Sequence, residues 1–196
     1  VLKWATAGAL AVLLGIAAGM FVLRPQVVAI TSGTLLKTPR AIDDFQLRAA
    51  SGAPFSKADL AGHWTVVFAG FTFCPDVCPT ALFEMTQVYA ALGADADKLK
   101  TYFVTIDPER DDQALLSLYL SSFDPHIVGL TGSGADVQTM VKAYRVYARK
   151  IEDKNGGYTM DHTALVYLMD KQGRFVSALN LQSPPETVAK EIQRYM

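Results

Sequence analysis

The longest apolar run of the chain lies near its start. Trp4 to Leu23 holds no charged residue and one weakly polar residue, Thr6, and Lys3 and Arg24 flank the run. Roughly 20 residues at about 1.5 Å each match the hydrocarbon thickness of a bilayer, whereas a signal peptide has an apolar core of about 7–15 residues. We therefore expect residues 1–24 to form a single uncleaved transmembrane anchor, with a cleaved signal peptide and a buried helix as alternatives.

A proline-containing stretch follows the apolar run. Residues 25–40 include Pro25, Pro39 and the sequence Thr-Ser-Gly-Thr at 31–34, which is typical of a linker. We expect this stretch to be a tether, so that residues 41–196 form one domain held at a membrane surface.

Beyond residue 41, short apolar segments alternate with amphipathic ones. Continuously apolar or β-branched runs predict strands at 65–71, 102–106 and 127–130, and two more, joined as a hairpin, at 164–169 and 175–179. Caps and apolar residues at helical spacing predict helices at 80–92, from Asp111 or Asp112 to about Ser122, from Ser133 past Tyr144, and from Pro185 onward. This order predicts an α/β, thioredoxin-like domain, with a parallel core sheet extended by an antiparallel hairpin.

The composition excludes several classes of protein. The chain has 196 residues, with 18 Lys and Arg against 19 Asp and Glu, so it lacks the excess of positive charge that marks many nucleic-acid-binding proteins. Two cysteines are too few for a disulfide-rich scaffold, and 51% hydrophobic residues is too high a share for a disordered chain. We expect no nucleic-acid partner.

Both cysteines lie in one proline-containing segment, residues 71–80 (FTFCPDVCPT). Pro79 fits the first position of a helix but not its interior, so we expect Cys78 to cap the helix at 80–92 and Cys74 to lie in the loop before it. Free N–H groups and the positive end of the helix dipole stabilise a thiolate there. Two such thiols can bind a soft metal ion or exchange with disulfides, and a purely structural disulfide is the remaining alternative.

A third metal ligand has to come from elsewhere in the chain. His63 and His126 are expected to be surface or turn residues. His162 comes just before the strand predicted at 164–169, and in a thioredoxin-like fold that segment faces the cysteine-containing loop. We therefore expect His162 and the two cysteines to form a metal site.

Three carboxylates are candidates for supporting this site. Asp161 is next to His162 and can orient its ring. Asp76 lies between the cysteines, where it adds negative charge or forms an Asx-type turn. Asp107 follows the strand predicted at 102–106, near the same edge of the sheet, and a turn towards the next helix is its alternative role.

Three motifs, in this order, resemble those of the Sco/SenC family. They are C-P-D-V-C-P after F-T-F, then T-I-D-P-E-R-D at 105–111, then D-H-T at 161–163. Members of this family are membrane-anchored, thioredoxin-like copper chaperones for the assembly of cytochrome c oxidase. The resemblance extends from about residue 41 to the C-terminus, and the anchor and tether match it as well. It implies that copper, as Cu(I) or Cu(II), binds Cys74, Cys78 and His162.

The same resemblance implies a partner and a location. The partner is a copper-site subunit of cytochrome c oxidase or another copper chaperone. The anchor lies in the bacterial inner membrane with the domain in the periplasm, or in the mitochondrial inner membrane with the domain in the intermembrane space.

The donor chemistry agrees with copper but leaves alternatives open. Two thiolates and an imidazole suit Cu(I) and Cu(II), and zinc also accepts this ligand set. A copper-binding metallochaperone is the favoured function. A thiol–disulfide oxidoreductase that reduces the cysteines of the oxidase copper site is the second, although its C-x-x-x-C spacing differs from the C-x-x-C of thioredoxins. A copper or redox sensor coupled to a membrane partner is the third.

Overall fold

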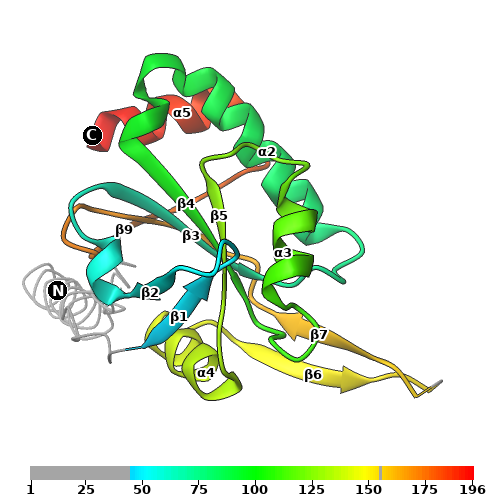
Figure 1. Ribbon diagram of the computed structural model, residues 1–196. Coiled ribbons are helices and arrows are strands. Elements are labelled where there is room, and N and C mark those ends of the chain that lie inside the picture. Colours follow the sequence, from blue (N-terminus) through cyan, green and yellow to red (C-terminus); the bar gives the residue numbers. More distant parts are fainter. Residues whose placement is uncertain (1–44, 155) are drawn as a thin grey trace, which may run out of the picture. The chain divides into compact units, whose positions relative to one another are not determined.

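The fold was analysed in a computed structural model that describes residues 45–154 and 156–196 (Figure 1). The anchor expected at residues 1–24 and the tether expected at 25–40 lie outside these ranges. In the part of the chain that the structure describes, no helix is both long enough and apolar enough to cross a membrane.

A seven-stranded mixed sheet forms the centre of the domain, in the order β2-β1-β5-β4-β3-β8-β9. Its strands are β1 (Gln46–Ala49), β2 (Pro54–Ser56), β3 (Trp64–Gly70), β4 (Leu99–Thr105), β5 (Ile127–Thr131), β8 (Val166–Met169) and β9 (Phe175–Leu179). The central strands β3, β4 and β5 run parallel, and each outer strand pairs antiparallel with its inner neighbour. Every residue of β3 is buried, which explains its continuous apolar sequence.

Helices cover both faces of this sheet. They are α2 (Val77–Leu92), α3 (Gln113–Leu120), α4 (Gly134–Ala143) and α5 (Pro185–Tyr195), with short 3-10 helices η2 (Lys57–Leu60) and η3 (Gly93–Lys98). A 2.8 Å hydrogen bond between the Tyr89 and Thr101 hydroxyls places α2 on one face, where α5 lies beside it (Figure 1). Met140 of α4 packs near Val67 and Val104 on the opposite face.

A second sheet, which the sequence analysis did not predict, consists of one antiparallel hairpin. Its strands are β6 (Ala148–Glu152) and β7 (Tyr158–His162), and it extends away from the main sheet (Figure 1). Both strands are half exposed and rich in polar residues, so they lack the continuous apolar run that predicted the core strands. His162 therefore ends a strand of its own instead of leading directly into β8.

The predicted order of helices and strands is otherwise confirmed, with boundaries shifted by up to three residues. The strands β1 and β2, which lie at one end of the main sheet, were not predicted. Asp112, and not Asp111, caps α3, since its side chain accepts a hydrogen bond from the Leu115 N–H at 2.8 Å.

The pH dependence of stability should reflect the surroundings of His126. Its ring stacks on Tyr89, and its Nε2 and Nδ1 contact the carboxylates of Asp97 and Asp124 at 3.1 and 2.6 Å. The hydrogen bond to Asp97, assisted by Asp124, raises the pKa of His126 above its usual value. The resulting stabilisation is fully present below the unfolded pKa of about 6.5 and is lost as pH rises through the folded pKa.

We therefore expect the difference in the free energy of unfolding between the wild type and His126→Gln to shrink as pH rises from about 6 to 8. Denaturant unfolding of the metal-free, reduced protein measures it. His63→Gln is the matched control. Because burial lowers the pKa of His63, the difference for this variant should instead grow as pH rises. A difference for His126→Gln that grows with pH would contradict this assignment.

Candidate metal centre

The candidate site lies at the edge of the sheet where the parallel strands end. β3 ends at Gly70 and β4 at Thr105, and residues 71–76 and 106–112 lead from them into α2 and α3. The Ile106 N–H donates to the Gly70 carbonyl oxygen at 2.8 Å, so these two loops begin side by side. Open α/β sheets bind their ligands at this edge, beyond the carboxyl ends of the strands.

The cysteine segment, residues 71–78, differs from the sequence-based prediction at its helical end. The helix α2 begins at Val77 and not at residue 80, so Cys78 lies in its first turn while Asp76 is the N-cap. The first hydrogen bond of the helix runs from the Thr80 N–H to the Asp76 carbonyl oxygen at 3.1 Å. Because N–H groups before that point need no partner within the helix, Pro79 fits inside the first turn.

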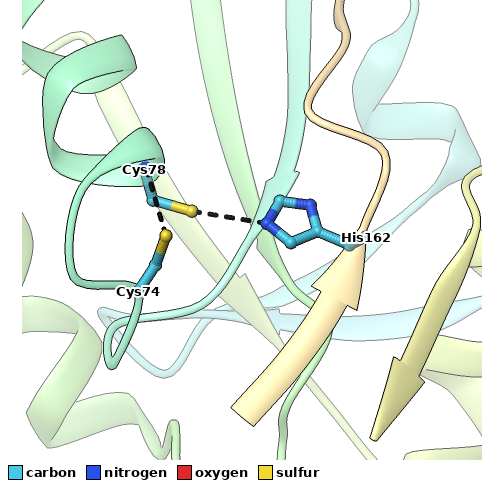
Figure 2. A group of neighbouring side chains, drawn as sticks. All are labelled: Cys74, Cys78 and His162. Carbon is cyan, nitrogen blue, oxygen red and sulfur yellow. Dashed lines mark hydrogen bonds between the residues drawn. The ribbon is translucent and has the colours of Figure 1, made fainter. Parts of the chain in front are cut away.

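The structure brings Cys74, Cys78 and His162 together (Figure 2). The sulfur of Cys78 lies 3.7 Å from Nε2 of His162, the Cys78 N–H points at the sulfur of Cys74 at 3.4 Å, and all three donor atoms lie within 4.8 Å of one another. A metal ion with bonds of about 2.3 Å to sulfur and 2.0 Å to nitrogen, at an angle of about 120°, would hold the Cys78 sulfur and His162 Nε2 roughly 3.7 Å apart. The cluster therefore fits one central ion, and within residues 45–154 and 156–196 no other His, Cys, Asp and Glu side chains form such a group.

The orientation of the His162 ring favours a role as a ligand. Its Nδ1 lies 3.1 Å from the carbonyl oxygen of Thr163, which can only accept, so Nδ1 carries the proton and Nε2 faces Cys78 with a lone pair. The edge of the ring packs against Phe71 at a centroid distance of 5.8 Å. Burial lowers the pKa of His162, which keeps the imidazole neutral and able to bind metal at neutral pH.

The surroundings of Cys78 correct one expectation. Its side chain is fully buried, and this burial raises the pKa of the Cys78 thiol far above its usual value, outweighing the helix N-terminus that was expected to hold a thiolate. Without a cation, Cys78 is therefore a protonated thiol that donates towards His162. A bound metal ion reverses this preference, because coordination removes the thiol proton.

Two residues that position the cysteine segment were not identified as site residues from the sequence. A Cβ on Gly70 would lie 2.8 Å from the Cys78 sulfur and 2.6 Å from the Phe103 ring, so only glycine leaves room for that sulfur. The fully buried carboxylate of Asp111 accepts hydrogen bonds from Thr72 N–H (3.0 Å), the Thr72 hydroxyl (2.6 Å) and the Thr105 hydroxyl (2.7 Å). The two consecutive aspartates at 111–112 were a signal in the sequence for this role of Asp111, because only one of them can cap α3.

The three predicted supporting carboxylates contact other groups. Asp161 is exposed and directly precedes His162 in β7, so the two side chains point to opposite sides of the strand. Asp76 accepts from the Thr80 hydroxyl at 3.4 Å. Asp107 is buried and binds Arg110 and Tyr158. Among the described residues, none of the three carboxylates forms a hydrogen bond with a candidate ligand.

The chain is similar to several known proteins. The model of the SCO1/SenC family matches residues 34–196. The mitochondrial SCO2 homologues of Danio rerio and Mus musculus are each 36% identical to the chain over 156 residues, or 78% of its length. The chain spans 56% and 61% of the lengths of these two relatives.

Solved structures show the same fold. Copper-bound ScoI of Bradyrhizobium japonicum is 50% identical, with a TM-score of 0.76, and the match covers 80% of this chain and 100% of that one. Copper-bound yeast Sco1 is 34% identical, with a TM-score of 0.71, and the match covers 80% of this chain and 88% of that one. These likenesses confirm the predicted family resemblance and the mixed α/β, thioredoxin-like fold.

Replacing Gly70 by alanine should disturb both the core and the Cys78 sulfur. We expect the free energy of unfolding to fall by about 1–3 kcal/mol, as is usual for overpacked cores. Denaturant unfolding of the reduced protein measures this change. Gly134→Ala is the matched control, because a Cβ at that position meets nothing within 4 Å. Equal stability of the two variants would show that the close approach at Gly70 does not matter.

Metal binding should release the Cys78 proton. Because burial raises the pKa of Cys78 and lowers that of His162, at neutral pH the thiol gives up a proton on binding and the imidazole does not. Affinity for Cu(I) should therefore rise at least about tenfold per pH unit between about pH 7 and 8. Titration against a competing chelator measures this slope, and an affinity independent of pH would contradict a thiol ligand with a raised pKa.

Proposed function

The chain belongs to the SCO1/SenC family, and we propose that it is a membrane-anchored copper chaperone that delivers copper to cytochrome c oxidase during assembly. The observation that carries this proposal is the cluster of two cysteine sulfurs and one imidazole nitrogen within 4.8 Å. Copper is the cargo of such a protein, so the site has to bind it and also give it up.

The ligand set supports copper as that cargo. Cys74 and Cys78 supply soft sulfur donors, which favour Cu(I), and with the imidazole of His162 they also suit Cu(II), the ion that heads the divalent affinity series. The relatives from Bradyrhizobium japonicum and yeast have been solved with copper bound. Geometry alone would also accept zinc, so the preference for copper depends on ligand softness and on the family.

The arrangement of the ligands supports transfer rather than storage. The two cysteines belong to the cysteine segment, whereas His162 belongs to a separate hairpin, so the site can open by moving one element. Cys74 and His162 are partly exposed, which leaves the ion accessible from one side. The recipient in this proposal is a copper-site subunit of cytochrome c oxidase or another copper chaperone.

The proposed location follows from the apolar run at residues 4–23 and from the family. BsSco, which shares this fold, is a member of the Sco family of cytochrome c oxidase assembly proteins, and the SCO2 relatives are mitochondrial. We place the anchor in the bacterial or mitochondrial inner membrane, with the domain in the periplasm or the intermembrane space.

A thiol–disulfide oxidoreductase is the second candidate function. The observation in its favour is that Cys74 and Cys78 are both free thiols, with their sulfurs within 4.8 Å of each other. A short movement would bring them to disulfide distance, so the pair could transfer two electrons and two protons to a partner's disulfide. Such a reaction needs the two thiols but not the imidazole.

The variant His162→Ala separates the two functions. It should lose stoichiometric copper after gel filtration, because two thiolates alone leave the ion short of a ligand, while both thiols stay titratable with a thiol reagent. Copper analysis and thiol counting on the reduced full-length protein give both readings. His126→Ala is the matched control and should retain copper.

Two outcomes would overturn the chaperone assignment. Full copper affinity in His162→Ala would remove the histidine from the site. Unchanged copper content in Cys74→Ser would remove the two-thiolate site. If disulfide reduction by the wild type is efficient and survives His162→Ala, the oxidoreductase function is favoured instead.

A further inference from the structure

The β6–β7 hairpin raises the question of what fixes His162 in place. The hairpin shares no strand pairing with the seven-stranded sheet, so backbone hydrogen bonds do not join it to the core as a strand. An isolated two-stranded hairpin is marginally stable in water. The position of His162, whose Nε2 lies 3.7 Å from the Cys78 sulfur, therefore depends on the short link from β7 to β8 and on side-chain contacts between the hairpin and the rest of the domain.

A group of polar contacts lies at the other end of β7. The Arg110 guanidinium pairs through Nε with the carboxylate of Asp107, and its Nη1 donates to the Tyr158 carbonyl oxygen at 3.0 Å. The Tyr158 hydroxyl donates to the second oxygen of the Asp107 carboxylate at 2.9 Å. Asp107 is only 3% exposed, which makes these contacts stronger than surface ion pairs.

The same guanidinium also contacts the cysteine segment. Its central carbon lies 3.7 Å from the centre of the Tyr158 ring and 4.6 Å from that of the Phe73 ring. Phe73 is the residue directly before Cys74. Arg110 therefore lies between the first residue of β7 and the segment that carries the two sulfurs, and its flat, delocalised charge suits stacking on two rings.

Tyr158 and His162 begin and end the same five-residue strand. Because they are four residues apart in a strand, their side chains point to the same side. Contacts that hold Tyr158 therefore also hold the strand in the direction that brings His162 to the sulfurs. The cysteines are held separately, through Thr72 by Asp111 and by the first turn of α2. The two halves of the site thus have different attachments to the core.

We propose that Asp107, Arg110 and Tyr158 form a latch that holds the β6–β7 hairpin against the cysteine segment, and that Arg110 is a positioning residue for the copper site. The proposal rests on the copper site proposed above. With the latch closed, an ion meets two sulfurs and one imidazole. With it open, the imidazole moves away with the hairpin while both sulfurs stay in place, which lowers copper affinity and gives a route for release.

The neighbouring ion pair between Lys150 and Glu109 provides an internal comparison. It also joins the hairpin to the loop after β4, at 2.7 Å, but its side chains are 43% and 70% exposed. Exposed pairs of this kind contribute little. Lys150→Gln is therefore a matched control for Arg110→Gln, since both variants remove one cation over the Tyr158 ring.

The first test uses the metal-free, reduced protein and amide hydrogen exchange. In Arg110→Gln we expect the amides of β6 and β7 to exchange at least about tenfold faster, because a hydrogen-bonded buried charge pair is lost, while those of β3 and α2 keep their wild-type rates. Tyr158→Leu removes the latch from the hairpin side and should give the same pattern even if Arg110→Gln folds poorly. Lys150→Gln should leave all rates within about twofold.

The second test uses copper and a double-mutant cycle. Arg110→Gln should lower Cu(I) affinity by about 10–100-fold in the wild-type background and by little in the His162→Ala background, because it acts through the histidine. The electron paramagnetic resonance spectrum of the Cu(II) form should lose its imidazole nitrogen coupling in Arg110→Gln and keep it in Lys150→Gln.

The outcomes separate this inference from the proposed function. Unchanged hairpin exchange in both Arg110→Gln and Tyr158→Leu would overturn the latch, whatever the protein binds. An equal loss of copper affinity in both backgrounds would show that Arg110 acts on the whole domain and not through His162. Absence of copper binding by the wild type would defeat the proposed function and the positioning role, while the exchange data would still decide whether the latch exists.

Discussion

The site depends on one arrangement, in which two cysteine sulfurs and one imidazole nitrogen come together from two parts of the chain that are held by different contacts. Cys78 is fixed by the first turn of α2, and its sulfur occupies the space that Gly70 leaves open at the end of β3. The imidazole of His162 comes from a hairpin outside the main sheet. Neither part alone offers three ligands, so metal binding reports on how the two are held together. The sulfur of Cys78 is thus held within the core, whereas the imidazole is carried by the hairpin.

Burial governs the chemistry of the metal-free site. It favours a protonated thiol at Cys78 and a neutral imidazole at His162, a pair that shares one proton without carrying charge. A soft cation replaces that proton and restores the charge balance, because coordination makes the buried thiolate favourable. The same burial that disfavours a bare thiolate therefore makes the metal ion compete with the Cys78 proton.

The sequence was sufficient to predict which three candidate ligands lie together and most of the core. Paired cysteines beside prolines, a histidine before a late strand and continuously apolar strands carry strong local signals, and the structure brings the three predicted ligands together. Gly70 could not be identified because its role depends on the Phe103 and Cys78 side chains, which pack against it only in the fold. The β6–β7 hairpin escaped prediction because its strands are half exposed and rich in polar residues, so they form no continuous apolar run. Asp107 was expected near the site, but its hydrogen bond with Tyr158 joins residues 51 positions apart, which spacing along the sequence does not reveal.

The central claim is that both sulfurs and the imidazole bind one copper ion. X-ray absorption at the copper edge, on the full-length reduced protein loaded with one equivalent of Cu(I), tests it most directly. The account predicts a first shell of two sulfurs at about 2.3 Å and one nitrogen near 2.0 Å, with the outer-ring scattering typical of imidazole. A shell with a single sulfur, or one without an imidazole nitrogen, would contradict it.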